Sequence, residues 1–142
     1  MGHSCLEWWN TVAETVLISV VDDDESVRRS LERLMKSVGL RVEVFTSAED
    51  FLHSDHLPDT SCLILDMRMP GMDGLELQGR LVATQSRIPI IFISGYGDEK
   101  VQAQALQAGA VAFLSKPFSD EILLKSIHVA LELSQDGIVA FL

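Results

Sequence analysis

Five short apolar runs alternate with segments of helical periodicity, and this alternation restricts the possible folds more than any other feature. The runs are residues 16–21 (VLISVV), 41–45 (RVEVF), 62–65 (CLIL), 89–93 (PIIFI) and 111–114 (VAFL). Strands that alternate with helices form βαβ units around a parallel sheet. Three of the runs are almost continuously apolar, as strands covered on both faces require. The sequence therefore predicts an α/β domain with a doubly wound five-stranded parallel sheet.

Signals for helices occupy the intervals between these runs. The first interval has the apolar stripe Val27, Leu31, Leu34, Met35 and Val38. These positions have helical spacing, and Gly39 follows them as a stop signal. Ser47, Asp73 and Ser119 stand where the N-caps of three further helices are expected. The helix predicted at residues 98–108 has a thin apolar face, so we expect burial to hold it only weakly.

Length and composition predict one domain. A chain of 142 residues that is 47% hydrophobic fits a single core. We assign residues 1–14 to an N-terminal extension, 15–133 to the domain and 134–142 to a C-terminal tail. The apolar runs are far shorter than the roughly 20 residues of a membrane span, and no secretory signal opens the chain, so we expect a cytoplasmic location without membrane contact. The formal charge of −10 argues against direct nucleic-acid binding by this chain.

Polar residues follow four of the five predicted strands. Asp22 and Asp23 follow the first strand, Asp66 the third, Ser94 the fourth and Lys116 the fifth. Ligands of open α/β sheets bind outside the carboxyl ends of the strands, where the strand order reverses. If the order is 2-1-3-4-5, as in flavodoxin-like folds, the crevice opens between the first and third strands. The three acids would then face one another.

Three facing carboxylates favour a bound cation. Two carboxylates about 5 Å apart repel each other by roughly 3 kcal/mol at an effective dielectric constant of about 20. An all-oxygen site with room for water suits Mg²⁺ or Mn²⁺, and the acids do not have the spacing of a calcium-binding EF-hand loop. The plainer alternative is that the acids cap the first helix. Asp24 is expected to do so, but capping needs one acid and does not account for Asp66.

The loop and the lysine beside these acids suggest phosphoryl chemistry. Residues 67–74 (MRMPGMDG) turn the chain tightly and leave Asp66 exposed at the sheet edge, although any strand-to-helix turn would use similar residues. Lys116 adds the positive charge that a transferred phosphoryl group needs, whereas a lysine snorkelling at a strand end is the common alternative. Ser94 could donate a hydrogen bond to a phosphoryl oxygen, or simply precede a glycine turn.

The chain contains four motifs in order, VVDDDESVR, LILDMRMPGMDG, FISGYGD and AVAFLSKPF. Together they resemble the receiver domain of two-component response regulators, and the FixJ-type branch most. The resemblance spans residues 15 to 133. It implies that Asp66 accepts a phosphoryl group from a histidine of a sensor kinase. It also implies that Mg²⁺ is bound by Asp23, Asp66 and the backbone carbonyl of Arg68, with Asp22 acting largely through water.

The same resemblance assigns the other polar residues. Lys116 would pair with the phosphoryl group, Ser94 occupies the switch hydroxyl position, and Phe113 is the switch aromatic residue. Negative charge added at Asp66 is expected to draw in Ser94, turn Phe113 inward and shift the helix at 98–108 with the strand after it.

The resemblance also implies partners and an output. A sensor histidine kinase would be the phosphoryl donor, and a homodimer could form through the face of the fourth helix, fifth strand and fifth helix. The domain would catalyse only its own phosphorylation and dephosphorylation. In a longer regulator it would control a DNA-binding domain and hence transcription. The sequence leaves open whether this chain stands alone or is part of such a regulator.

Three other classes of protein fit part of the pattern. A haloacid-dehalogenase-type phosphatase also binds Mg²⁺ beside a nucleophilic aspartate, but similarity to that family would require a second aspartate where this chain has Arg68. A flavodoxin-like nucleotide or flavin binder would need a phosphate loop where this chain has DDDE. A pseudo-receiver that binds partners without phosphorylation is the third.

Overall fold

A computed structural model of the protein describes residues 16–95 and 99–134. The strands are β1 (Leu17–Val21), β2 (Arg41–Phe45), β3 (Cys62–Asp66), β4 (Ile90–Ser94) and β5 (Ala112–Ser115). The helices are α2 (Glu25–Ser37), α3 (Ala48–Leu52), α4 (Gly74–Ala83), α5 (Glu99–Gln107) and α6 (Asp120–Ser134). Every strand begins and ends within one residue of its predicted position. The predicted extension at residues 1–14 and the tail beyond Ser134 lie outside the described residues.

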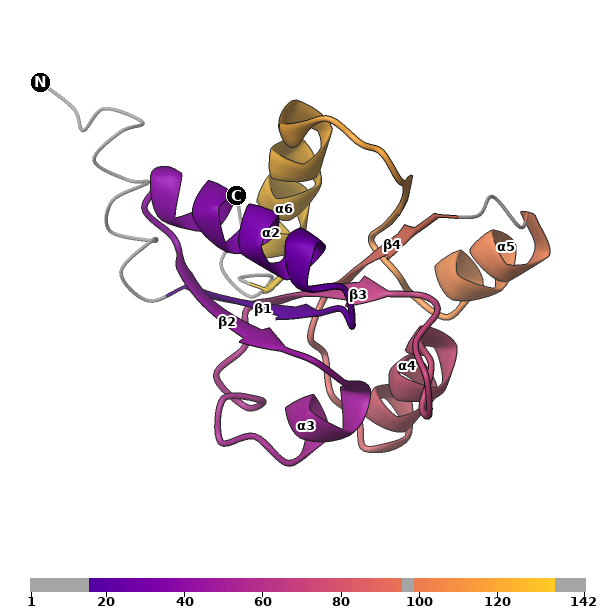
Figure 1. Ribbon diagram of the computed structural model, residues 1–142. Helices are drawn as coiled ribbons and strands as arrows, with labels where there is room; N and C mark the ends of the chain where they lie inside the picture. The colour runs from indigo at the N-terminus through magenta and orange to yellow at the C-terminus, as the bar shows by residue number, and fades with distance from the viewer. Residues whose placement is uncertain (1–15, 96–98, 135–142) are drawn as a thin grey trace, which may run out of the picture.

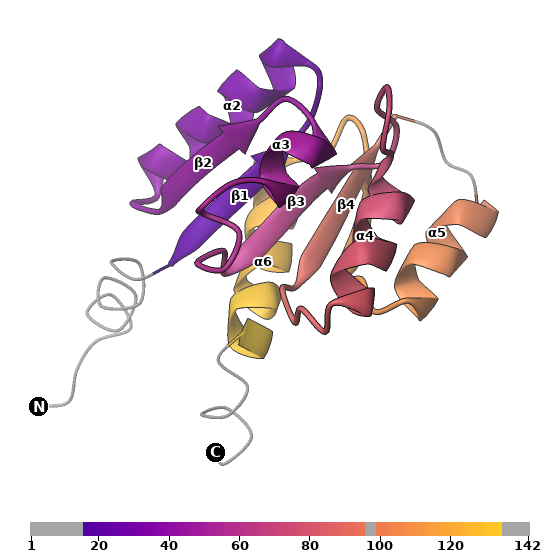
Figure 2. The ribbon, with the colours of Figure 1, turned by 90° about the horizontal axis from the view of Figure 1, so that it is seen from below.

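The strands form one parallel sheet in the order β2-β1-β3-β4-β5. Helices α2 and α6 cover one face of this sheet, and α3, α4 and α5 cover the other (Figure 1). Seen from below, the strands point in the same direction (Figure 2). The predicted fold class and strand order are therefore confirmed. None of the helices in the described part of the chain combines the length and the apolar character needed to cross a membrane.

The core has two layers, one on each face of the sheet. Ile64 of β3 packs in the layer with Met35 of α2, whereas the next residue, Leu65, packs in the layer with Leu77 of α4. Successive side chains of a strand point to opposite faces, so one apolar strand supplies both layers. This explains why β1, β3 and β4 are buried along their whole length.

The predicted N-caps are confirmed. Each cap residue accepts a hydrogen bond on its side chain from a backbone N–H of the first helical turn. The pairs are Asp24 with Ser26 (2.8 Å), Ser47 with Asp50 (3.1 Å), Asp73 with Glu76 (2.9 Å) and Ser119 with Ile122 (3.1 Å). These caps begin the helices shortly after the strands end, which keeps the polar turns at one edge of the sheet.

Helix α5 is held by little apolar burial, as its sequence predicts. Ala105 is its buried residue, and Leu106 remains 41% exposed. A buried polar contact supplements this packing, since the side-chain amide of Gln78 in α4 donates to the carbonyl oxygen of Ala105 at 3.0 Å. Weak apolar burial makes α5 the helix best suited to move.

Gly74 joins the core to the loop after β3. A Cβ at this position would lie 2.7 Å from the carbonyl oxygen of Asp66 and 2.9 Å from the ring of Phe92. The first of these atoms belongs to the backbone and cannot rotate away. The start of α4 can therefore pack against the end of β3 only because residue 74 has no side chain.

We expect Gly74→Ala to lower the free energy of unfolding by about 1–3 kcal/mol, the usual effect of overpacking. Gly79→Ala, on the exposed side of the same helix, has no atom within 4 Å of the new Cβ and should raise stability by about 0.5–1 kcal/mol. Urea denaturation measures both. A Gly74→Ala protein as stable as the Gly79→Ala protein would contradict this reading of the packing.

Candidate functional site

Three acidic side chains meet at the carboxyl ends of β1 and β3. One carboxylate oxygen from each of Asp22, Asp23 and Asp66 lies within 4.8 Å of the other two. Asp22 is fully buried, Asp66 is 5% exposed, and Asp23 is exposed. The expectation that the loop after β3 leaves the Asp66 side chain exposed is therefore wrong, because Lys116 from the turn after β5 lies against its carboxylate. Val21 pairs with Leu65 in the sheet, so the two strands end side by side. The predicted grouping of the acids is therefore present.

Lys116 reaches this cluster from the turn after β5. Its Nζ lies 3.1 Å from Oδ2 of Asp22 and 3.6 Å from Oδ1 of Asp66. Its backbone N–H donates to the carbonyl oxygen of Ser94 at 2.7 Å, which ties the turn to the end of β4. The following peptide bond, to Pro117, is cis. The ammonium group thus bridges two of the three carboxylates.

The pKa of Asp66 reflects its burial and the charges around it. Burial, and then the negative charge of Asp22, raise the pKa of the Asp66 carboxyl to about 7. Lys116 and the N–H of Arg68, which donates to Oδ1 of Asp66 at 3.5 Å, act in the opposite direction without cancelling the rise. Three carboxylates therefore face a single ammonium, and burial adds to the cost of ionising Asp66. An all-carboxylate set that is short of positive charge fits a hard divalent cation such as Mg²⁺.

The third acid of the DDDE run has a different role. Asp24 caps α2, accepting hydrogen bonds from the backbone N–H of Ser26 at 2.8 Å and from its hydroxyl at 2.7 Å. The hydrogen bond from the Ser26 hydroxyl is the main reason why the pKa of Asp24 is lowered. The run therefore divides as predicted, with two acids in the cluster and one at the helix terminus.

Ser94 lies on β4, the strand next to β3, and Phe113 lies on β5, the strand next to β4. Ser94 ends β4, is 2% exposed and pairs in register with Ser115 of β5. Phe113 is half-buried, and its ring centroid lies 6.1 Å from that of Phe92 on β4. The described contacts do not test the switch roles of Ser94 and Phe113, which remain predictions.

Two residues beside the site were given no role from the sequence. Arg28 belongs to the first motif, yet only the structure shows its Nη1 donating to the carbonyl oxygen of Asp22 at 2.7 Å. Oε2 of Glu49 in α3 accepts a hydrogen bond from the N–H of Met72 at 3.5 Å and lies beside Gly71, whose φ is +76°. Such contacts join separate elements and produce no periodic pattern in the sequence. They can therefore be identified only in the tertiary structure.

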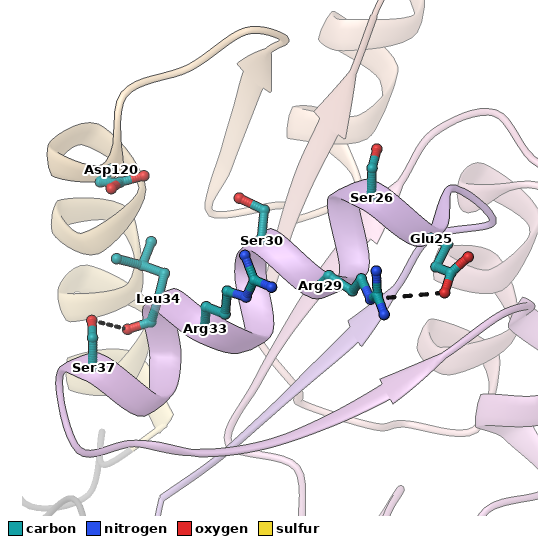
Figure 3. Close-up of a pocket in the computed structure, with 8 residues that line it drawn as sticks. All are labelled: Glu25, Ser26, Arg29, Ser30, Arg33, Leu34, Ser37 and Asp120. Atoms are coloured by element: carbon teal, nitrogen blue, oxygen red, sulfur yellow. Dashed lines mark hydrogen bonds and ion pairs between the residues drawn. The ribbon is translucent and has the colours of Figure 1, made fainter.

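A groove of about 590 Å³ runs along α2 to Asp120 at the start of α6 (Figure 3). Its lining residues do not include the clustered acids, which lie beyond the first turn of α2. A second hollow of about 450 Å³ is lined by Lys116 but by none of the three acids. Of the three acids, Asp23 is exposed to solvent, whereas Asp22 and Asp66 are buried.

The raised pKa of Asp66 predicts how stability varies with pH when no metal is bound. Between its ordinary value of 3.8 and about 7, the folded protein holds a proton that the unfolded chain has released. Rising pH therefore destabilises the fold across this window. In EDTA, the stability of Asp66→Asn relative to the wild type should increase by about 1–3 kcal/mol between pH 4 and pH 8.

Urea denaturation at several pH values measures this change. Asp55→Asn is the matched control, because it removes an exposed carboxylate that lies outside the acid cluster. If the difference for Asp66→Asn varies with pH no more than the difference for Asp55→Asn, Asp66 is not the group that titrates near neutrality.

Comparison with known proteins agrees with this geometry. A family model described as the response regulator receiver domain matches residues 18–128. Nodulation protein W of Bradyrhizobium diazoefficiens is 50% identical over 125 residues, which cover 87% of this chain and 55% of that protein. The transcriptional regulatory protein FixJ of the same organism is 45% identical over 116 residues, covering 80% of this chain and 56% of that protein. The chain thus spans about half the length of these curated relatives.

Solved structures show the same similarity. The response regulator StyR superimposes with a TM-score of 0.80 at 45% sequence identity, covering 89% of this chain and 64% of that chain. The N-terminal part of FixJ superimposes with a TM-score of 0.75 at 39% identity, covering 82% of this chain and 94% of that chain.

Proposed function

Because the chain belongs to the family of response regulator receiver domains, we propose that it accepts a phosphoryl group on Asp66 in a reaction that depends on Mg²⁺. The donor is the phosphohistidine of a sensor histidine kinase. The single observation that carries this proposal is the position of the Asp66 carboxylate, 3.6 Å from the Lys116 ammonium and within 4.8 Å of two other acids. A phosphoryl group at this position would lie beside both the Asp66 nucleophile and the positive charge of Lys116.

Asp66 and Lys116 have separate roles in the proposed phosphoryl transfer. An oxygen of the Asp66 carboxylate attacks phosphorus, a P–O bond forms, and the P–N bond to the donor histidine breaks with its electron pair leaving on the imidazole. The Lys116 ammonium moves little to pair with the incoming phosphoryl oxygens, because it already lies between Asp22 and Asp66. Positioning and charge neutralisation supply most of the catalysis in such transfers.

The cation would be held by the carboxylates of Asp23 and Asp66 and by the backbone carbonyl of Arg68, with Asp22 acting largely through water. When bound, Mg²⁺ supplies the positive charge that offsets the charge on the transferred group. It also favours the ionised form of Asp66, whose pKa of about 7 would otherwise leave much of it protonated near neutrality. Mn²⁺ has the same preference for oxygen ligands and should substitute.

Phosphorylation would change the conformation of α5 and β5. The new negative charge at Asp66 attracts the hydroxyl of Ser94 at the end of the adjacent strand, and Phe113 of β5 turns toward the space this leaves. Helix α5 follows because it has a small buried face. The two arrangements form a population equilibrium that the phosphoryl group biases.

The altered face of α5, β5 and α6 would pass the signal on. Leu106 of α5 and Ile122 of α6 expose 41% and 46% of their surface, which suits contact with a second copy of the chain or with an output domain. We place the domain at residues 15–133 and expect it in the cytoplasm, where a kinase of this class would reach it. In a longer chain the output would be transcription.

Incubation with acetyl phosphate and Mg²⁺ should add about 80 Da to the wild-type chain in intact-mass spectrometry. The added mass should be absent from Asp66→Asn, which lacks the nucleophilic oxygen, and strongly reduced when EDTA removes the metal.

Asp59→Asn is the matched control, because Asp59 is exposed and should leave the modification unchanged. Absence of added mass in the wild type would instead favour a pseudo-receiver that binds partners without phosphorylation. Repeated turnover of phosphate esters, with no lasting modification, would favour a phosphatase.

Ser94→Ala should leave phosphorylation of Asp66 intact while uncoupling it from α5. In the wild type we expect phosphorylation to change amide exchange in α5 by about fivefold or more, within the usual range of coupling between protein sites. Ser94→Ala should lose that change, and Ser115→Ala should keep it, because the exposed hydroxyl of Ser115 lies on the neighbouring strand in the same register. A normal response in Ser94→Ala contradicts this switch.

A further inference from the structure

Arg28 makes a hydrogen bond to each end of the acidic run at residues 22–24. Its guanidinium Nη1 donates to the carbonyl oxygen of Asp22 at 2.7 Å, and its backbone N–H donates to the carbonyl oxygen of Asp24 at 3.1 Å. The side chain is half-buried and reaches back from the first turns of α2 to the end of β1. Asp23, the exposed acid of the cluster, lies between these two anchored residues.

Asp22 is held from several elements at once. Its N–H donates to the carbonyl oxygen of Phe45 in β2 at 3.2 Å. Its carboxylate accepts from the N–H of Asp24 at 2.8 Å and from Lys116 at 3.1 Å. The hydrogen bond from Arg28 to the carbonyl oxygen is shorter than any of these, and its donor is charged. Hydrogen bonds with a charged partner are stronger than neutral ones, so of the two bonds made by the Asp22 backbone, the one from Arg28 should contribute more than the one to Phe45.

On the basis of the function proposed above, we propose that Arg28 is a positioning residue for the divalent cation. It touches neither the cation nor the phosphoryl group. By anchoring the carbonyl of Asp22, it orients the carboxylates of Asp22 and Asp23 toward Asp66. Three carboxylates that already converge need less ordering when the cation binds, which raises its affinity.

Charge and positioning make opposite predictions at this residue. The guanidinium places a positive charge beside the metal site, so its charge alone disfavours a cation. If charge were its main effect, deleting Arg28 would strengthen Mg²⁺ binding. If orientation of the acids is its main effect, deletion weakens Mg²⁺ binding. The sign of the change in affinity therefore distinguishes the two roles.

Arg29 is the matched control. It is the next residue of the same helix, its side chain is 69% exposed, and its Nε lies 3.8 Å from Oε1 of Glu25. Figure 3 shows this pair along the surface of α2. Arg29→Met removes the same charge from the same helix as Arg28→Met, but within the described residues Arg29 pairs with Glu25 and not with Asp22. Any difference between the two proteins reports the hydrogen bond rather than the net charge.

Calorimetric titration of the full chain with Mg²⁺, without a phosphoryl donor, measures the affinity directly. We expect Arg28→Met to weaken binding about five- to tenfold, as the loss of a charged hydrogen bond at a partly exposed site implies. Arg28→Lys should weaken it about threefold, because a flexible ammonium anchors a carbonyl less rigidly than a guanidinium does. Arg29→Met should remain within about twofold of the wild type, since its charge is solvated.

Two further readouts separate positioning from a general loss of structure. In the metal-free protein, the amide of Asp24, which donates to Asp22, should exchange faster in Arg28→Met than in Arg29→Met. With acetyl phosphate as donor, Arg28→Met should need more Mg²⁺ for half-maximal phosphorylation, while its rate at saturating Mg²⁺ stays within about twofold of the wild type. A lower maximal rate with an unchanged Mg²⁺ requirement overturns the positioning role.

Unchanged or tighter Mg²⁺ binding by Arg28→Met also overturns it, as does equal weakening in Arg29→Met. If Arg28→Met does not fold, Arg28→Lys decides, and wild-type affinity in that protein overturns the role. A wild-type chain that binds Mg²⁺ but accepts no phosphoryl group contradicts the proposed function alone, because the affinity comparison uses no donor.

Discussion

The ion pairs of Lys116 with Asp22 and Asp66 are the interaction on which the rest of the site depends. The ammonium Nζ lies 3.1 Å and 3.6 Å from the two carboxylates, and both acids are buried. A single positive charge cannot balance these acids together with Asp23, so burial and the charge of Asp22 still raise the pKa of Asp66. The same shortage of positive charge is the physical basis for the cation proposed at this edge of the sheet.

The fold supports this edge by separating apolar packing from polar turns. Strands β1, β3 and β4 are buried throughout, and their alternating side chains fill a layer on each face. Parallel strands bring all their carboxyl ends to one edge, so the polar residues that follow them need not enter the core. Gly74 lies between the apolar core and the polar turn after β3. Because it has no side chain, α4 can begin against the backbone of Asp66. A rigid sheet thus presents the acids, while weakly buried α5 can still move.

Most of the fold and the site membership could be predicted, for local reasons. Short, nearly continuous apolar runs mark the buried strands, the 3.6-residue spacing of apolar residues marks the helices, and cap residues mark where helices begin. Once the strand order is assumed, Asp22, Asp66 and Lys116 must share an edge. The acidic run DDDE was harder to divide, yet Asp24 precedes the helix directly and accepts from Ser26 as a cap does. Segment boundaries moved by one residue, which left every strand-end residue at the correct edge.

The sequence by itself determined the alternation of strands and helices and the capped helix starts, because both depend on residues close together in the chain. It also determined which polar residues lie at the carboxyl edge, because parallel strands all end at the same edge of the sheet. Only the tertiary structure decided which atoms meet. Lys116 contacts Asp22 across 94 positions, Gln78 reaches Ala105 across 27, and the guanidinium of Arg28 turns back to a carbonyl rather than outward to solvent. Such contacts depend on sheet twist, on helix placement and on rotamers, which are set by packing between elements distant in the sequence.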